Sequence, residues 1–89
     1  MNQNTDFEKA KETFILGLNS LEKKDFQNAE NYFRESLKYL PDRVSTLTNL
    51  SSALRQQNKF TEAHQSALQS IQLDPQNLEG WMVIPPQVN

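Results

Sequence analysis

The sequence contains no cysteine, only two glycines, and four prolines at positions 41, 75, 85 and 86. Without cysteine the chain has neither a disulfide framework nor a thiolate metal site. No stretch approaches the roughly 18 apolar residues that a membrane helix needs. The polar start "MNQNTDFEKA" also lacks the apolar core of a signal peptide. At 89 residues the size indicates one small domain.

A dominant charge is missing as well. Nine basic and eleven acidic residues are well mixed and give a net charge of −2. No cluster of lysine or arginine provides the electrostatic footprint of a protein that binds nucleic acid or anionic lipid. We therefore expect a soluble, cytoplasmic protein with no nucleic-acid and no membrane partner.

What the chain does contain is apolar residues at helical spacing. The spacing predicts helices at about 6–23, 26–40, 44–57 and 60–74, and a fifth that begins near Leu78. Thr5 and Glu8 fit a capping box at the start of the first helix. Pro41 and Pro75 mark helix ends, because proline lacks an N–H and disfavours helix in the residue before it. The short connections predict antiparallel neighbours.

Two segments repeat each other 34 residues apart, "KDFQNAENYFRESLKYLP" from Lys24 and "NKFTEAHQSALQSIQLDP" from Asn58. Each unit is predicted to be a hairpin of two helices that buries its apolar faces only by stacking on the next. Small residues should stand where helix backbones approach, leucines should fill the layer between helices, and phenylalanines should plug the hairpin ends. The residues concerned are Gly17, Ser51, Ala29 and Ala63; Leu16, Leu50 and Leu54; and Phe26 and Phe60.

This arrangement resembles the tetratricopeptide repeat family, whose helix pair reads W-x2-L-G-x2-Y, A-x3-F and P. The first unit has Leu16-Gly17, Ala29-x3-Phe33 and Pro41; the second has Leu50-Ser51, Ala63-x3-Ala67 and Pro75; Trp81 falls where a third unit has its tryptophan. Thr13, Ser20, Ser36 and Ser70 depart from the pattern and are expected to weaken local packing. The resemblance implies an all-α, short right-handed solenoid. Its parts are a helix start at 1–9, repeats at 10–43 and 44–77, and a truncated third repeat with a tail at 78–89.

The sequence offers little for catalysis. His64 is the only histidine, and no cysteine, serine or aspartate forms a recognisable motif with it. Glu30, Glu35 and Glu62 lack the spacing of a metal site, and no glycine-rich phosphate loop is present. We expect no enzymatic activity and no cofactor.

The resemblance implies a binding surface instead, a concave groove lined by the first helices of successive repeats. The candidate groove residues are Lys11, Phe14, Leu18, Ser45, Asn49, Ser52, Arg55 and Gln56. Asn49 matches a groove asparagine that bonds the backbone of a bound peptide. The clamp that some members use for chaperone C-termini is not carried, because Phe14, Leu18, Glu79 and Val83 stand at its positions. Alternatively, Phe14 and Leu18 pack against a turn around Phe7 or against another copy.

Three functions remain open at this point. The first is a non-enzymatic module that binds a protein or peptide in the groove. The second is an N-terminal docking or oligomerisation segment of a larger bacterial-type enzyme, such as a glycosyltransferase or methyltransferase.

The third function is self-association. Pro85 and Pro86 restrict the third unit to a short helix, which would leave Leu54, Leu68 and Ile71 uncovered. Either the tail folds back over them or a homodimer forms through the C-terminal end. The candidates for self-association are Leu68, Ile71, Trp81, Met82 and Ile84.

Overall fold

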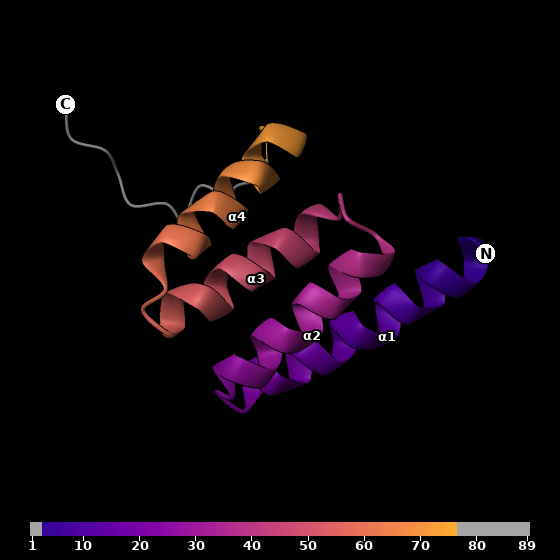
Figure 1. Cartoon of the computed structure of the whole chain (residues 1–89), viewed down its shortest axis with the longest axis horizontal. Helices are drawn as coiled ribbons and strands as arrows, with labels where there is room; N and C mark the ends of the chain where they lie inside the picture. The colour runs from indigo at the N-terminus through magenta and orange to yellow at the C-terminus, as the bar shows by residue number, and fades with distance from the viewer. Residues whose placement is uncertain (1–2, 77–89) are drawn as a thin grey trace.

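The computed structural model describes residues 3–76 and contains four helices within them. They are α1 (Gln3–Glu22), α2 (Phe26–Tyr39), α3 (Val44–Gln56) and α4 (Phe60–Leu73). Each runs antiparallel to the previous one, so that α1 with α2 and α3 with α4 form two hairpins that meet through α2 and α3 (Figure 1). This confirms the predicted all-α stack of helix hairpins.

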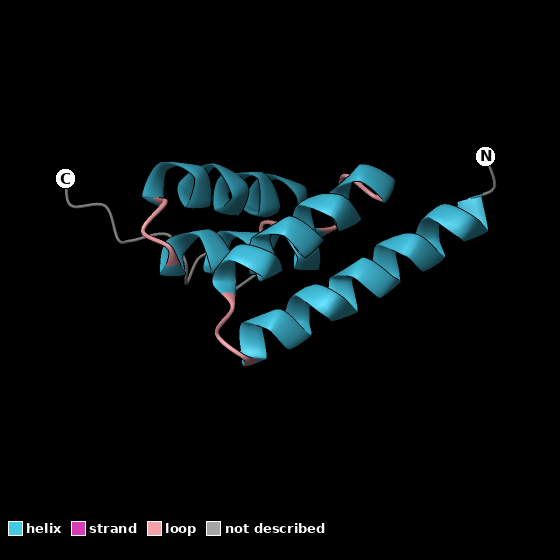
Figure 2. Ribbon diagram, turned by 60° about the horizontal axis from the view of Figure 1, so that its bottom comes forward, coloured by secondary structure: helices cyan, strands magenta, loops and turns pink. Residues whose placement is uncertain are grey.

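The first helix, α1, extends further toward its N-terminus than the sequence predicts. The N-terminal end of α1 projects past the other helices (Figure 2). The predicted capping box at Thr5 is wrong, because α1 already begins at Gln3 and Thr5 lies inside its first turn.

None of the four helices in residues 3–76 combines the length and apolar character required to cross a bilayer.

The two hairpin turns repeat the same backbone geometry. Lys24 and Asn58, 34 residues apart, have positive φ angles of 61° and 64°. After each of them a backbone N–H reaches back into the preceding helix: Asp25 donates to Ser20 at 2.8 Å and Lys59 to Leu54 at 2.9 Å. Such a left-handed residue ends a helix and satisfies its last carbonyls. The 34-residue period therefore extends from the side chains to the backbone.

The core lies where the two hairpins meet. Its buried cluster consists of Ala29, Phe33, Leu50, Ala53, Leu54 and Ala63. A leucine or phenylalanine buried in this way contributes about 1.5–3 kcal/mol. The predicted small positions are confirmed, because Ala29 is 0% and Ala63 is 4% exposed, and Gly17 is buried directly against the ring of Phe33. Leu54 belongs to this cluster and is fully buried, so it forms no part of an open face.

Two core predictions are wrong. Leu16 is 44% exposed. The buried side of α1 contains Ala10 and Gly17, and successive residues of a helix point about 100° apart, so Leu16 is directed away from that side. Phe60 is 59% exposed, whereas its counterpart Phe26 is half-buried. The difference follows from position in the stack, because α2 packs on both α1 and α3 while α4 packs mainly on α3.

Buried hydroxyl groups join the helices within each hairpin. Ser36 of α2 donates to the carbonyl of Ala10 at 2.7 Å, and Ser51 of α3 donates to that of Ala63 at 2.6 Å. The hydroxyls of Thr48 and Ser70 lie 2.8 Å apart. Ser36 and Ser70 therefore do not weaken the packing as predicted, since each replaces the usual small apolar residue by an inter-helix hydrogen bond.

Candidate functional site

The predicted groove residues of α1 lie on one side of the helix. Lys11, Phe14 and Leu18 follow each other at three- and four-residue steps, and Phe7 continues the line toward the N-terminus. Phe7 and Leu18 are 50% and 37% exposed, and Lys11 is exposed too. Phe14 is half-buried, with its ring centroid 5.8 Å from that of Phe33. Phe14 is thus partly a core residue, whereas its three neighbours are accessible.

The predicted residues of α3 form a second, uncharged line. Ser45 and Gln56 are exposed, and Asn49 and Ser52 are half-buried. The side-chain amide of Asn49 donates to the Ser45 carbonyl at 2.8 Å, one helical turn back. Arg55 is exposed but lies about 100° from Gln56, off this line. We call the two lines together, Phe7–Leu18 and Ser45–Gln56, the inner face.

The two lines approach each other at Arg43, which precedes α3. Its guanidinium carbon lies 5.7 Å from the ring centroid of Phe7 and 5.7 Å from that of Phe14. Guanidinium groups stack favourably on aromatic faces at this distance. Sequence reasoning missed Arg43, because no local pattern indicates that a residue of the α2–α3 turn meets rings on α1.

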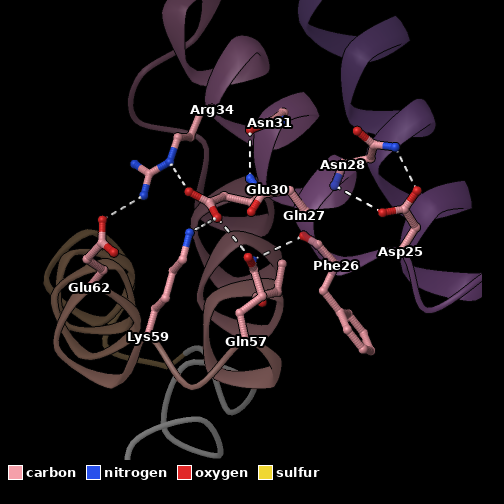
Figure 3. Close-up of polar contacts among 11 residues, drawn as sticks. Asp25, Phe26, Gln27, Asn28, Glu30, Asn31, Arg34, Gln57, Lys59 and Glu62 are labelled. Atoms are coloured by element: carbon pink, nitrogen blue, oxygen red, sulfur yellow. Dashed lines mark hydrogen bonds and ion pairs between the residues drawn. The ribbon is translucent and has the colours of Figure 1, made fainter.

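A second cluster joins the hairpins on Glu30, whose side chain is only 8% exposed (Figure 3). Its Oε2 accepts from Arg34 at 2.8 Å, and its Oε1 accepts from Gln57 at 3.0 Å and from Lys59 at 2.9 Å. Arg34 also reaches Glu62 of α4 at 3.1 Å. Glu30 of α2 thus contacts the end of α3 and the following turn directly, and Arg34 extends the cluster to α4.

The cluster controls the ionisation of Glu30. Burial alone would raise the pKa of this carboxyl, but the hydrogen bonds from Lys59, Arg34 and Gln57 outweigh burial and lower the pKa from 4.5 to about 2. Both oxygens are therefore occupied and the group stays charged at neutral pH. Its hydrogen bonds with Gln57 and Lys59 hold the two hairpins together. Sequence reasoning considered Glu30 only as a metal ligand and rejected it. The role as a link between hairpins was missed because its partners Gln57 and Lys59 are distant in the chain.

The other sites considered in the sequence are less well placed for chemistry. His64 is half-buried on α4, and residues 3–76 contain no group of three acidic, histidine or cysteine side chains that could hold a metal ion. Of the self-association candidates, Leu68 is 40% exposed and Ile71 is 9% exposed. Trp81, Met82 and Ile84 lie outside the described residues.

Comparison with known proteins agrees with this geometry. Two models of the tetratricopeptide repeat match, one at residues 14–43 and the other at residues 43–73. The solved structure of the TPR domain of Arabidopsis OM64 is similar, with a TM-score of 0.86 and 18% identity over 88% of this chain. This chain spans 64% of that structure's length, and at such identity the likeness concerns the fold alone. No curated protein sequence matches. The chain belongs to the tetratricopeptide repeat family.

Proposed function

We propose that this chain is a non-catalytic binding module that holds an extended segment of a protein partner on the inner face. Tetratricopeptide repeats generally serve protein interaction. The observation that favours the inner face is the pairing of unlike lines, with exposed apolar Phe7 and Leu18 on α1 and neutral hydrogen-bonding side chains on α3. An extended peptide presents both apolar side chains and backbone amides, which such a surface complements.

Asn49 is the residue best suited to bind the peptide backbone. Its amide nitrogen carries two hydrogens, and the hydrogen bond to Ser45 uses one of them. The second hydrogen and the side-chain oxygen match the carbonyl and N–H of a peptide bond. Because the hydrogen bond to Ser45 orients the side chain, little conformational entropy is lost on binding.

The test uses peptides selected from a display library on the immobilised protein and measured by calorimetry. Asn49→Ala and Arg55→Glu should both leave the circular dichroism spectrum unchanged. Asn49→Ala should weaken binding about tenfold, the value of one well-made hydrogen bond in a shielded site. Arg55→Glu, which lies off the line of Asn49, should weaken binding less.

A matched control variant is Lys38→Glu, which changes an exposed residue of α2 away from the inner face. It should bind the selected peptides like the wild type. Equal binding by the wild type, Asn49→Ala and Arg55→Glu, with intact folding, would contradict the inner face as the binding site.

We also propose self-association through α4 as a second function. The specific observation is that Phe60 is 59% and Leu68 40% exposed, with the half-buried His64 midway between them at four-residue steps. These residues lie on one side of α4. Pairing of two identical faces about a two-fold axis would bury them and would not grow further.

Light scattering across a tenfold dilution series tests self-association. We expect the measured mass of the wild type to rise with concentration toward twice 10.3 kDa. The Leu68→Glu variant should have a lower mass at the same concentrations. A mass near 10.3 kDa at every concentration would exclude the dimer.

A further inference from the structure

The guanidinium of Arg43 is held in place but not neutralised. It stacks against Phe7 and Phe14, yet within residues 3–76 it makes no hydrogen bond and no ion pair. Its Nη1 is shielded from water and has no hydrogen-bond partner. A buried donor without a partner costs free energy, so such groups normally meet an acceptor. The residue as a whole is half-buried, so a ligand has access to parts of Arg43 other than Nη1.

The start of α3 adds a second, independent demand for negative charge. Arg43 occupies the N-cap position, where the side chain usually supplies an oxygen, and it makes no capping hydrogen bond. Arginine has no acceptor, and the first turn of α3 contains no acidic residue. A cation thus stands at the positive end of the helix dipole, an arrangement that an anion would stabilise.

No carboxylate within residues 3–76 fills this role. Asp6 and Asp42 are the acidic residues next to Phe7 and Arg43 in the sequence, and neither lies within the 4.0 Å of an ion pair with Arg43. The Oδ1 of Asp6 is itself shielded and without a partner. Lys11, exposed on the same line of α1 as Phe7, adds positive charge to the inner face.

We propose that the partner segment carries a carboxylate next to an apolar residue, and that this carboxylate binds Arg43 at the start of α3. The apolar residue lies against Phe7, whose ring contacts the same guanidinium. The inference rests on the proposed function and adds to it a preference for acidic over neutral segments. Arg43 is the residue that determines this specificity.

The experiment compares two small probes that differ only in charge, N-acetylphenylalanine and its amide. Each is titrated into the full chain, and the NMR signals of the Arg43 Nε–H and of the Val44–Thr46 amides are followed. We expect the carboxylate to bind about five- to tenfold more tightly than the amide, since one charge-assisted hydrogen-bonded pair is gained in a partly shielded site.

Variants identify the anchor. Arg43→Gln should bind both probes equally, whereas Arg43→Lys should keep part of the preference, because it retains the charge but loses the planar fork. Lys38→Gln, which removes an exposed charge of α2 away from the inner face, is the matched control and should keep the preference unchanged. Asp6→Asn should increase the affinity for the carboxylate, because it removes the negative charge that precedes Phe7 in the sequence.

Equal affinity of the wild type for the two probes, or an unchanged preference in a folded Arg43→Gln variant, would overturn the inference. Peptides selected for the proposed function separate the two ideas. Peptides that bind in an Asn49-dependent way but show no enrichment of acidic residues would contradict the anchor and leave the binding module intact. Absence of any binding peptide would contradict both.

Discussion

Gly17 and Phe33 share a space that only one side chain can occupy. A Cβ added at Gly17 would lie 2.7 Å from Cδ1 and 2.9 Å from Cζ of the Phe33 ring. Phe33 is 0% exposed and belongs to the cluster between the hairpins, so its ring cannot move into solvent. The single glycine of α1 thus sets how closely α1 approaches α2.

Gly17→Ala is therefore expected to destabilise the protein, although alanine is the better helix former. The gain in helix propensity is about 1 kcal/mol, and the cost of overpacking is about 1–3 kcal/mol. Urea unfolding should give a net loss of about 1 kcal/mol. In the double variant with Phe33→Leu the alanine should be tolerated much better, and additive effects of the two changes would contradict the contact.

The Glu30 cluster predicts a defined dependence of stability on pH. The pKa of Glu30 is about 2 in the folded protein against 4.5 for the free group, so the unfolded chain takes up the proton first. The stabilisation is complete above about pH 5 and is lost as the pH falls from about 4.5 through about 2. Its size is about 1–3 kcal/mol, limited because Arg34 and Lys59 are partly solvated.

Urea unfolding of the wild type and of Glu30→Gln between pH 2 and pH 7 measures this dependence. The variant should be less stable at pH 7, and the difference should shrink toward pH 2. Glu35→Gln is the control, because the ion pair of Glu35 with Lys38 at 3.1 Å is exposed and should contribute less than about 0.5 kcal/mol. A difference that is constant with pH would refute the assignment.

The left-handed residues of the two hairpin turns predict stabilising substitutions. Lys24→Gly should raise the free energy of unfolding by about 0.5–1 kcal/mol, because glycine adopts a φ of 61° without the clash of a Cβ. Asn58→Gly should gain less, since asparagine tolerates this conformation better than lysine. Thermal melts of both variants show which substitution stabilises more. A Lys24→Gly variant less stable than the wild type would contradict the left-handed geometry of the turn.

The equivalent alanines of the repeat predict sensitivity to volume. Ala29→Leu and Ala63→Leu should each destabilise the folded protein by about 1–3 kcal/mol. Both alanines are buried, so the larger side chain must displace neighbouring helices. The control is Gln65→Leu, which introduces the same leucine at an exposed position of α4 and should change the stability little. Melts followed by circular dichroism that leave both alanine variants like the wild type would contradict the stacking register.

Much of the inner face could be predicted, but its most specific residue could not. Lys11, Leu18, Ser45, Ser52 and Gln56 are accessible or partly so, as expected for side chains directed away from the core of an amphipathic helix. Phe14 is shared with the core because α2 brings Phe33 against it. Arg43 escaped prediction because its partners lie about 30 residues earlier in the chain.

The sequence by itself determined the helices, the 34-residue hairpin unit and the places where only small residues fit. These features depend on the period of apolar residues, on proline and on backbone approach, which are encoded locally and then repeated. The tertiary structure alone decided that Leu16 and Phe60 are exposed, that Glu30 joins the two hairpins, and that Arg43 stacks on two rings. The physical reason is that burial and charge pairing depend on which neighbours each helix receives. Among the helices of residues 3–76, α2 and α3 each pack extensively on two others, whereas α1 and α4 pack mainly on one.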